Sequence, residues 1–287
     1  MIRVCLVGLG KTGKEIAKVL SDRPDMKLVA AICSPGSSKA GKDLGEIVDC
    51  RDTGIIVESS EKLEEIIFRT KPDIVVDFSR PEATIRNAVV FAKMRINIVV
   101  ATTGFSRISL KRLFILTRKY HIGIVYAPNI TLGVNVMMLL ANIASSLLNN
   151  YDFQITEQHH SRKKDIPSGT ALKIAGEIEK GLAATGTVKD SIPINAVRAG
   201  GIIGKHEVSI IGEEDKLEIS HESFSRKAFA AGAIKAVKFL YKKTGYFEMS
   251  DVLNLGRVLG DLVEREKNSL GRRYLKCKPK PDETMVN

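Results

Sequence analysis

The stretch from Glu157 to Thr170 gathers the side chains of this sequence that are best suited to moving protons. It reads Glu-Gln-His-His-Ser-Arg-Lys-Lys-Asp-Ile-Pro-Ser-Gly-Thr and holds two of the five histidines of the chain. An imidazole at His159 or His160 can donate or accept a proton near neutral pH, and Lys163 can supply a second proton or a positive charge. These residue types suit the reduction of an imine or enamine, in which the atom that becomes basic needs a proton donor.

The same stretch ends at a predicted helix start. Ser168, Gly169 and Thr170 precede a run with helical spacing, Ala171–Leu182, and a helix N-terminus offers amides and a favourable dipole to a carboxylate. A plainer interpretation stays open, in which this is a solvated basic loop that only caps the helix, but capping does not explain the paired histidines. A metal site is not expected, because adjacent histidines diverge and no third ligand is spaced to join them.

A glycine-rich turn follows the first apolar run of the chain. Gly8, Gly10 and Gly13 form a Gly-x-Gly-x-x-Gly pattern directly after Val4–Val7 and at the start of a helical stretch. The first glycine permits a tight turn, the second lets backbone amides approach a pyrophosphate, and the third lets the helix pack closely on the strand. At the first strand–helix junction of an alternating series, this pattern predicts a dinucleotide site.

The second predicted strand, Lys27–Cys33, is followed by Ser-Pro-Gly-Ser-Ser-Lys and has no acidic residue at its end. A carboxylate there would hold the ribose hydroxyls of NAD. Ser34, Ser37, Ser38 and Lys39, with Lys11 nearby, can instead receive a 2′-phosphate, so the sequence favours NADPH and leaves NADH use open. Thr102 and Thr103 end another predicted strand, where ligands lie in doubly wound folds, although capping of a turn is the alternative.

The first 130 residues alternate between strand-length apolar runs and stretches of helical spacing. Continuous Val and Ile runs are typical of strands that are buried on both faces. The pattern therefore predicts an α/β fold of the Rossmann type, a doubly wound parallel sheet with helices on both faces. We expect strands at 3–7, 27–33, 73–78, 97–101 and 123–126, and helices at 14–20, 63–68, 83–93 and 110–119.

Beyond Asn129 the pattern changes to strand-like runs that are punctuated by glycine and joined by short turns. This predicts a second, α+β domain with a mixed, mostly antiparallel sheet. A charged, irregular tail is expected from Gly271 onward. We expect strands at 153–157, 194–198, 206–211 and 216–221, and helices at 132–148, 171–182, 226–242 and 251–266.

Composition narrows the choice of partners. The 287 residues carry a formal net charge of +11, but the basic residues are spread along the chain without a basic stripe or interleaved aromatics, so no nucleic-acid partner is expected. The surplus instead favours small anions. The longest apolar runs are strand-length and the chain enters a strand at once, which predicts a cytoplasmic protein without a membrane partner. Four scattered cysteines indicate no disulfide or metal framework.

With these residues in view, the sequence resembles the dihydrodipicolinate reductase (4-hydroxy-tetrahydrodipicolinate reductase) family from Met1 to about Asp261. The resemblance rests on Glu157-x-His-His-x-x-Lys163-x-Asp165-x-Pro-Ser-Gly-Thr170. Further matches are Asp77-Phe-Ser-x-Pro81, Ala101-Thr-Thr-Gly-Phe105, Ala127-Pro-Asn-Ile130, Val197-Arg-Ala-Gly200, Gly204-x-His-Glu207, His221 and Ser225-Arg-x-x-Phe-Ala230.

The resemblance implies an oxidoreductase of the lysine and diaminopimelate pathway. A hydride from NAD(P)H would reduce a small cyclic dicarboxylate, after loss of its hydroxyl, to tetrahydrodipicolinate. His159 would donate or accept a proton, Lys163 would be the second proton donor, and His160, Gly169 and Thr170 would bind substrate. The cofactor would contact Gly8, Leu9, Gly10, Lys11, Thr12 and Gly13, then Ala101, Thr102 and Thr103, and finally Ala127, Pro128, Asn129 and Ile130.

Members of this family are usually homotetramers that assemble through the substrate-domain sheet, and their final helices return to the nucleotide domain. The resemblance therefore implies a dinucleotide-binding domain of residues 1–129 and 241–287, and a substrate-binding and oligomerisation domain of residues 130–240. The sequence departs from the family pattern in three places. Cys33 replaces an acidic residue, Val7 stands where a first glycine is more common, and the segment 184–197 is short.

Two rival functions remain at the level of sequence. One is a related dehydrogenase that acts on another amino or imino acid. The other is a non-catalytic NAD(P)-binding regulator, which would keep the glycine turn and lose its proton donors, whereas His159 and Lys163 are both present. Arg198 and His221 stay open between a structural and a functional role.

Overall fold

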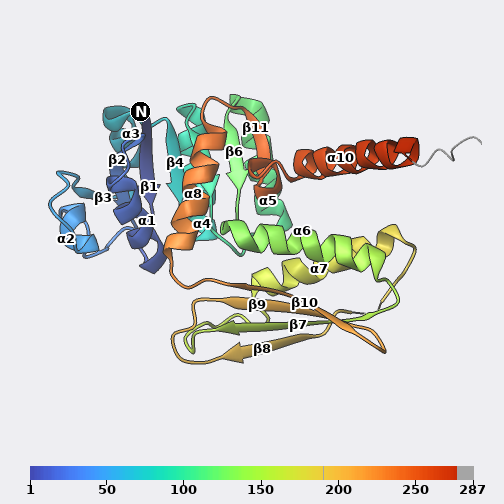
Figure 1. Ribbon diagram of the computed structural model, residues 1–287. Helices are drawn as coiled ribbons and strands as arrows, with labels where there is room; N and C mark the ends of the chain where they lie inside the picture. Colours follow the sequence, from blue (N-terminus) through green and yellow to red (C-terminus); the bar gives the residue numbers. More distant parts are fainter. Residues whose placement is uncertain (190, 277–287) are drawn as a thin grey trace, which may run out of the picture. The chain divides into compact units, whose positions relative to one another are not determined.

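The computed structural model describes residues 1–189 and 191–276, and of residues 268–276 it describes the backbone alone. The chain forms two compact units, Met1–Met249 and Ser250–Asn287, which are described separately. The first unit contains a sheet of seven strands and a sheet of four (Figure 1). The second unit contains helix α10 (Leu255–Lys276). Among the described residues, no helix combines the length and the apolar character that crossing a membrane requires.

The seven-stranded sheet is parallel throughout, as expected for strands whose Val and Ile runs are buried on both faces. Its strand order is β11-β6-β5-β4-β1-β2-β3, so the direction of winding reverses between β1 and β4. In such a sheet, ligands bind beyond the carboxyl ends of the strands at that reversal. The strands are β1 (Ile2–Val7), β2 (Met26–Cys33), β3 (Val57–Ser59), β4 (Ile74–Asp77), β5 (Asn97–Val100), β6 (Gly123–Tyr126) and β11 (Gly245–Glu248).

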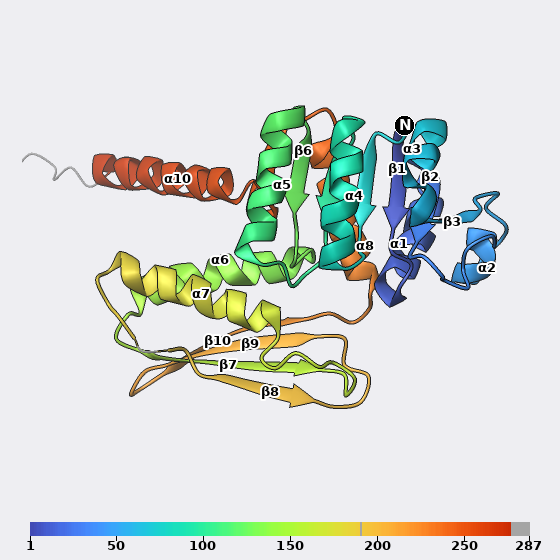
Figure 2. The same cartoon turned by 180° about the vertical axis from the view of Figure 1, so that it is seen from behind.

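Helices cover both faces of this sheet, which confirms the predicted Rossmann-type architecture. On one face α1 (Lys11–Ser21) lies beside α8 (Lys227–Leu240), and Figure 1 shows both in front of the sheet. The other face, seen in Figure 2, carries α3 (Leu63–Thr70), α4 (Pro81–Lys93) and α5 (Arg107–Tyr120). The short α2 (Leu44–Val48) and a 3₁₀ turn (Ser60–Lys62) connect β2 to α3.

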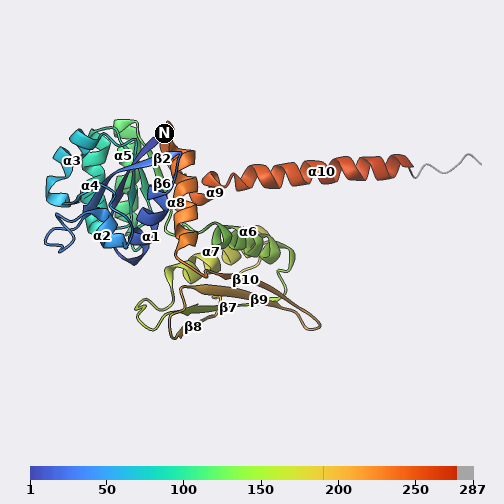
Figure 3. The same ribbon diagram turned by 60° about the vertical axis from the view of Figure 1, so that its left-hand side comes forward.

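The four-stranded sheet has the order β10-β9-β7-β8, with β8 parallel to β7 and the other neighbours antiparallel. This confirms the mixed, mostly antiparallel sheet of the prediction. Helices α6 (Leu132–Leu147) and α7 (Gly169–Ala184) lie on one face of this sheet (Figure 3), where the alternate side chains Phe153 and Ile155 of β7 and Val208 and Ile210 of β9 are buried against them. The strands are β7 (Asp152–His159), β8 (Ile194–Arg198), β9 (Lys205–Ile211) and β10 (Lys216–Glu222).

Some elements differ from the expectation. The sequence predicted neither β3, β11 nor α2, which are three to five residues long and carry little periodic signal. The last predicted helix, 251–266, is two helices, α9 (Met249–Val252) and α10. Because α10 continues to Lys276, the predicted irregular tail is wrong for residues 271–276, and its remainder, 277–287, lies outside the described residues.

Candidate active site

The register of the four-stranded sheet brings five ionisable side chains together. Glu157 and His159 are two residues apart on β7, so both point to the helix-covered face. Directly opposite them, Arg198 of β8 pairs with His159, and His206 of β9 pairs with Glu157. His221 of β10 lies opposite His206 in turn. Residues paired in register share a face, and this face therefore carries a polar cluster at the end of an otherwise apolar layer.

Glu157 is the centre of the cluster and is fully buried. Arg198 approaches it with two nitrogens, Nη2 at 2.6 Å from Oε1 and Nη1 at 3.0 Å from Oε2. The Ser168 amide donates to Oε1 at 3.1 Å, and His159 Nδ1 contacts Oε2. Burial raises the pKa of Glu157, but the hydrogen bonds from Arg198 and His159 outweigh it, and the pKa lies below its usual value. The group is therefore a carboxylate at neutral pH.

His159 presents its two ring nitrogens to different surroundings. Nδ1 faces Glu157, while Nε2 lies toward Gly204, where an added Cβ would be 3.2 Å away. The ring packs edge-on against His206, with centroids 5.1 Å apart. Burial lowers the pKa of His159, Glu157 raises it and Lys163 lowers it, with a net decrease. Because His206 is more deeply enclosed, burial lowers its pKa to about 3, so His206 is neutral.

A cavity of about 340 Å³ lies beside this cluster. His159, His160, Lys163 and Thr170 line it from the segment that the sequence singled out for proton chemistry. The opposite wall comes from α1 and from the segments that follow β5 and β6, and it holds predicted cofactor residues. These are Thr12, Thr103, Pro128, Asn129 and Ile130. The structure thus brings the predicted catalytic residues and part of the predicted cofactor site to one space.

A second cavity of about 620 Å³ continues from the first, since both are lined by Thr103, Asn129, Lys163 and Thr170. Two contacts fix side chains that line both cavities. The Thr170 hydroxyl donates to Asn129 Oδ1 at 2.6 Å, and Lys163 Nζ pairs with Asp165 at 2.8 Å. Gly169, at the first position of α7, lines this second cavity and has no atom within 4 Å of an added Cβ.

Two predicted ligand residues point elsewhere. Ser168 is 1% exposed, its hydroxyl caps α7 at the Ala171 amide and contacts His206, and it lines neither cavity. The Thr102 hydroxyl bonds to Asp77 and accepts from Thr84 below the strand ends, so its side chain is structural. Ala101 and Ala127 are buried at the ends of their strands.

The glycine turn fits a dinucleotide. Gly8 has φ 92°, and an added Cβ would lie 2.6 Å from the Phe78 backbone, while a Cβ on Gly13 would lie 1.9 Å from the Gly8 oxygen. Gly10, by contrast, has open space where its Cβ would be, and it begins a helix whose first turn has no acidic residue. These features leave the amides of the turn accessible to a phosphate. Leu9 is buried, Lys11 is exposed, and Ser34 is exposed after β2.

Several residues of the cavity escaped the sequence-based search, among them His206, Gly204, Ser223, Arg226 and Phe229. Four of them lie in motifs that matched the family, Gly204-x-His-Glu207 and Ser225-Arg-x-x-Phe-Ala230, but nothing in their spacing shows that β9 and the residues around the start of α8 meet His159. Only the strand register reveals it. Arg198, which the sequence left open, is now placed as the partner of Glu157.

The sequence-based argument about metal ligands considered His159 together with His160, whereas the structure places His159 beside Glu157 and His206. Among the described residues, Glu157, His159 and His206 offer ligand atoms that all lie within 4.8 Å of one another. However, the guanidinium of Arg198 occupies both oxygens of Glu157, and a cation at this point would face that positive charge. We therefore describe the group as a buried ion-pair network.

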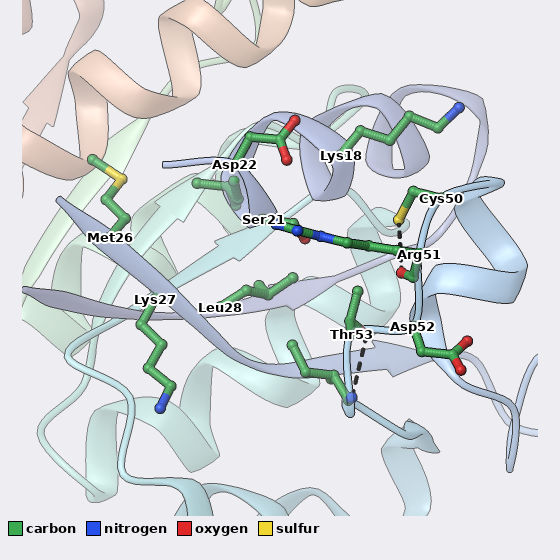
Figure 4. Close-up of a pocket in the computed structure, with 12 residues that line it drawn as sticks. Lys18, Ser21, Asp22, Met26, Lys27, Leu28, Cys50, Arg51, Asp52 and Thr53 are labelled. Atoms are coloured by element: carbon green, nitrogen blue, oxygen red, sulfur yellow. Dashed lines mark hydrogen bonds between the residues drawn. The ribbon is translucent and has the colours of Figure 1, made fainter. Parts of the chain in front are cut away.

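A different cavity of about 570 Å³ lies between α1, β2 and the α2–β3 loop (Figure 4). Lys18, Lys27 and Asp52 line it, and Arg51 extends across it toward Ser21. No histidine lines this cavity, and its charges are of both signs. It offers neither the paired proton carriers nor the helix N-terminus of the site around His159.

Comparisons with known proteins agree with this geometry. Models of the N-terminal and C-terminal domains of dihydrodipicolinate reductase match residues 2–130 and 133–253. The 4-hydroxy-tetrahydrodipicolinate reductase of Methanococcus aeolicus is 35% identical over 272 residues, which cover 89% of this chain and 99% of that protein. The corresponding enzyme of Methanopyrus kandleri is 36% identical, with 90% and 98% covered.

Solved structures extend the likeness to the fold. A dipicolinate-bound dihydrodipicolinate reductase from Paenisporosarcina superposes with a TM-score of 0.70 and 28% identity, over 86% of this chain and 97% of that one. An amine dehydrogenase from Mycobacterium smegmatis superposes with a TM-score of 0.59 at 16% identity, over 86% and 94% of the two chains, and shares the fold alone.

Proposed function

Because the chain belongs to the dihydrodipicolinate reductase family, we propose that it reduces 4-hydroxy-tetrahydrodipicolinate to tetrahydrodipicolinate with a nicotinamide dinucleotide, as a step in lysine and diaminopimelate biosynthesis. One observation carries this proposal. His159, His160 and Lys163 line a single cavity together with residues that follow β5 and β6, where the nucleotide-binding sheet presents its ligands.

The reaction requires proton carriers on the protein. The substrate loses its hydroxyl as water and gains a hydride and a proton, so one dinucleotide and one proton are consumed. The bound dinucleotide supplies the hydride. The protein takes a proton from the ring, gives one to the leaving hydroxyl and gives another to the reduced ring. Two groups of different basicity, the imidazole of His159 and the ammonium of Lys163, suit these transfers.

Each of the two groups has a defined starting state. His159 begins neutral because burial lowers its pKa, and with Nδ1 held by Glu157 it accepts a proton at Nε2, beside the cavity. Lys163 begins paired with Asp165. An anionic substrate favours the imidazolium form of His159, so its binding prepares this group as a donor.

Carboxylates of the substrate have a docking point at the start of α7. This helix has 16 residues and no acidic residue in its first turn, so its N-terminal dipole attracts an anion. The Gly169 amide donates to the Asp165 carboxylate, whose place a substrate carboxylate would take. His160 and Lys163 line the adjoining space, and Arg226 adds a positive charge to the same cavity. Ser168 contributes its position as the cap, with its hydroxyl directed away from the cavity.

For the cofactor we propose a preference for NADPH, with NADH as a second substrate. The segment after β2 presents Ser34, Ser37, Ser38 and Lys39 and no carboxylate, which suits a 2′-phosphate. The turn from Gly8 to Gly13 would hold the pyrophosphate through its amides. Thr103 and Asn129 would face the nicotinamide end, since both line the two cavities near Lys163.

We also propose a homotetramer formed through the four-stranded sheet. Helices α6 and α7 cover one face of that sheet, and among the described residues up to 249 no helix or strand covers the other (Figures 1 and 2). We propose residues 1–129 and 241–287 as the cofactor-binding part and residues 130–240 as the substrate-binding and oligomerisation part. Helix α8 falls in the second range by sequence and packs on the seven-stranded sheet.

The deciding experiment measures oxidation of NADPH and NADH by the purified protein at 340 nm, with substrate made in place by a synthase. We expect turnover with both dinucleotides, a lower KM for NADPH, and competition by pyridine-2,6-dicarboxylate. His159→Gln and Lys163→Ala should each lower kcat by roughly 10²–10⁴-fold while dinucleotide binding is retained. Turnover of other imino acids at a comparable kcat/KM, or full activity of both variants, would contradict the proposal.

A further inference from the structure

We propose that Glu157 and Arg198 form a positioning pair that fixes the tautomer and orientation of the His159 imidazole. This inference rests on the proposed role of His159 as a proton carrier and goes beyond it, because neither Glu157 nor Arg198 lines the cavity. Both act through His159.

The first step of the argument is the asymmetry of the His159 ring. Nδ1 contacts the carboxylate of Glu157, which accepts hydrogen bonds and donates none. The proton of the neutral imidazole therefore resides on Nδ1, and the lone pair resides on Nε2, on the side of Gly204 and the cavity. A carboxylate held against one ring nitrogen is the arrangement by which proteins select a histidine tautomer.

The second step concerns what holds Glu157. Its side chain is fully buried between strands, and Arg198 and the Ser168 amide occupy the remaining acceptor positions. A lone buried carboxylate would take up a proton or draw a full positive charge onto His159. The guanidinium balances that charge, so Glu157 orients the imidazole and leaves it free to lose its proton.

Arg198 also reaches the second proton carrier. Its Nη2 donates to the Asp165 main-chain oxygen at 2.6 Å, and the Asp165 carboxylate pairs with Lys163 at 2.8 Å. The Arg198 guanidinium therefore holds two groups in place. One is the Glu157 carboxylate that contacts His159, and the other is the loop segment whose Asp165 pairs with Lys163.

Glu157 and Arg198 act on the pKa of His159 in opposite directions, so their effects can be measured separately. Glu157 on β7 favours the imidazolium, whereas Arg198 on β8 and Lys163 on the loop between β7 and α7 oppose it, and His206 on β9 is neutral. Asp165 is neutralised by Lys163. Removing the Glu157 charge should lower the pKa of His159, and removing the Arg198 charge should raise it.

The test uses Glu157→Gln, Arg198→Gln and the double variant, with Glu64→Gln on the exposed side of α3 as a matched control. We expect the His159-dependent limb of the kcat/KM profile to move about one pH unit to lower pH in the first variant and to higher pH in the second. The double variant leaves no unpaired buried charge and should return the limb to within a few tenths of a unit, with kcat still reduced at least tenfold because the tautomer is no longer fixed. The control should match the wild type.

A second readout separates this inference from the proposed function. In protein labelled with ¹⁵N-histidine, the five histidines can be assigned by single substitutions, and the titration of His159 is followed directly. We expect a wild-type ring protonated at Nδ1 and opposite pKa shifts in the two single variants, whether or not His159 is essential for turnover. Shifts of the same sign, or a Nε2-protonated ring in the wild type, would overturn the positioning pair. Melting temperature and NADPH affinity report whether each variant is folded.

Discussion

Among single residues, Lys163 has a partner that the substrate must displace or share. Asp165 holds its ammonium at 2.8 Å, and this carboxylate is largely exposed. Burial raises the pKa of Asp165, but the hydrogen bond from Lys163 outweighs it and the pKa lies below its usual value, so the pair is charged at neutral pH. Exposed ion pairs contribute about 0–1 kcal/mol, which an incoming dicarboxylate can replace.

Asp165→Asn should therefore release Lys163 for the substrate. We expect the KM for the dicarboxylate to fall about two- to fivefold, with little change in melting temperature. Steady-state kinetics at low and high salt check this, because the gain should shrink as ionic strength rises. A KM that increases would mean that Asp165 holds Lys163 in its working position.

Substitutions at two glycines of the cofactor turn should affect the stability of the fold and the binding of the dinucleotide differently. A methyl group on Gly13 would meet the Gly8 oxygen at 1.9 Å, whereas one on Gly10 would meet nothing within 4 Å. Gly13→Ala should cost at least about 1–3 kcal/mol of unfolding free energy and weaken dinucleotide binding as well. Gly10→Ala should keep the melting temperature and weaken binding alone. Calorimetry and fluorescence titration with NADPH distinguish the two effects, and equal stability losses would contradict this description.

At the scale of helices and strands, the sequence was most informative where a strand contains Val and Ile or where a helix has a long periodic signal. β8 and β6 occur at the predicted residues, and the predicted starts of α3 and α6 are correct. β11 was not predicted because Gly245–Glu248 has no Val or Ile and follows a basic loop, so that only its pairing with β6 identifies it as a strand. The segment from Glu157 to Thr170 was recognised from its residue types. The positions of Arg198 and His206 beside it depend on the strand register, which no local sequence pattern fixes.

The packing of α7 on α6 offers a test within one helix. An added Cβ on Gly181 would lie 2.1 Å from the Ser145 hydroxyl and 2.3 Å from the Asn142 backbone oxygen, but on Gly176 it would meet nothing within 4 Å. Gly181→Ala should destabilise the fold by about 1–3 kcal/mol. Gly176→Ala should stabilise it by about 0.5–1 kcal/mol, since alanine favours helices. Chemical denaturation checks both signs, and similar effects at the two positions would refute the close helix contact.

For the molecule as a whole, the buried histidines of the site together determine how the free energy of unfolding falls at acidic pH. Burial lowers the pKa of four of the five histidines, His159, His160, His206 and His221. Groups with a lowered folded-state pKa take up protons on unfolding, so stability is lost as the pH falls below the unfolded value of 6.5. For His206, with a pKa of about 3, the loss between pH 7 and pH 5 is about 2 kcal/mol.

This dependence is measurable by denaturation at pH 5, 6 and 7. We expect a steep loss of stability in the wild type and a shallower slope in His206→Gln. The exposed His121 provides a matched substitution, and His121→Gln should leave the slope unchanged. A wild-type stability that is flat from pH 7 to pH 5 would show that these rings are solvated.

The hydrogen bond between Thr170 and Asn129 joins the wall of the cavities that comes from α7 to the wall that follows β6. Asn129 follows the last strand before α6, and Thr170 opens α7, so a dinucleotide that immobilises the first also restrains the second. The ligand that binds first therefore bears the loss of conformational entropy that ordering Asn129 and Thr170 requires. The second ligand then binds to residues that are already ordered. Dinucleotide and dicarboxylate should consequently strengthen each other's binding, and removal of the Thr170 hydroxyl should make the two affinities independent.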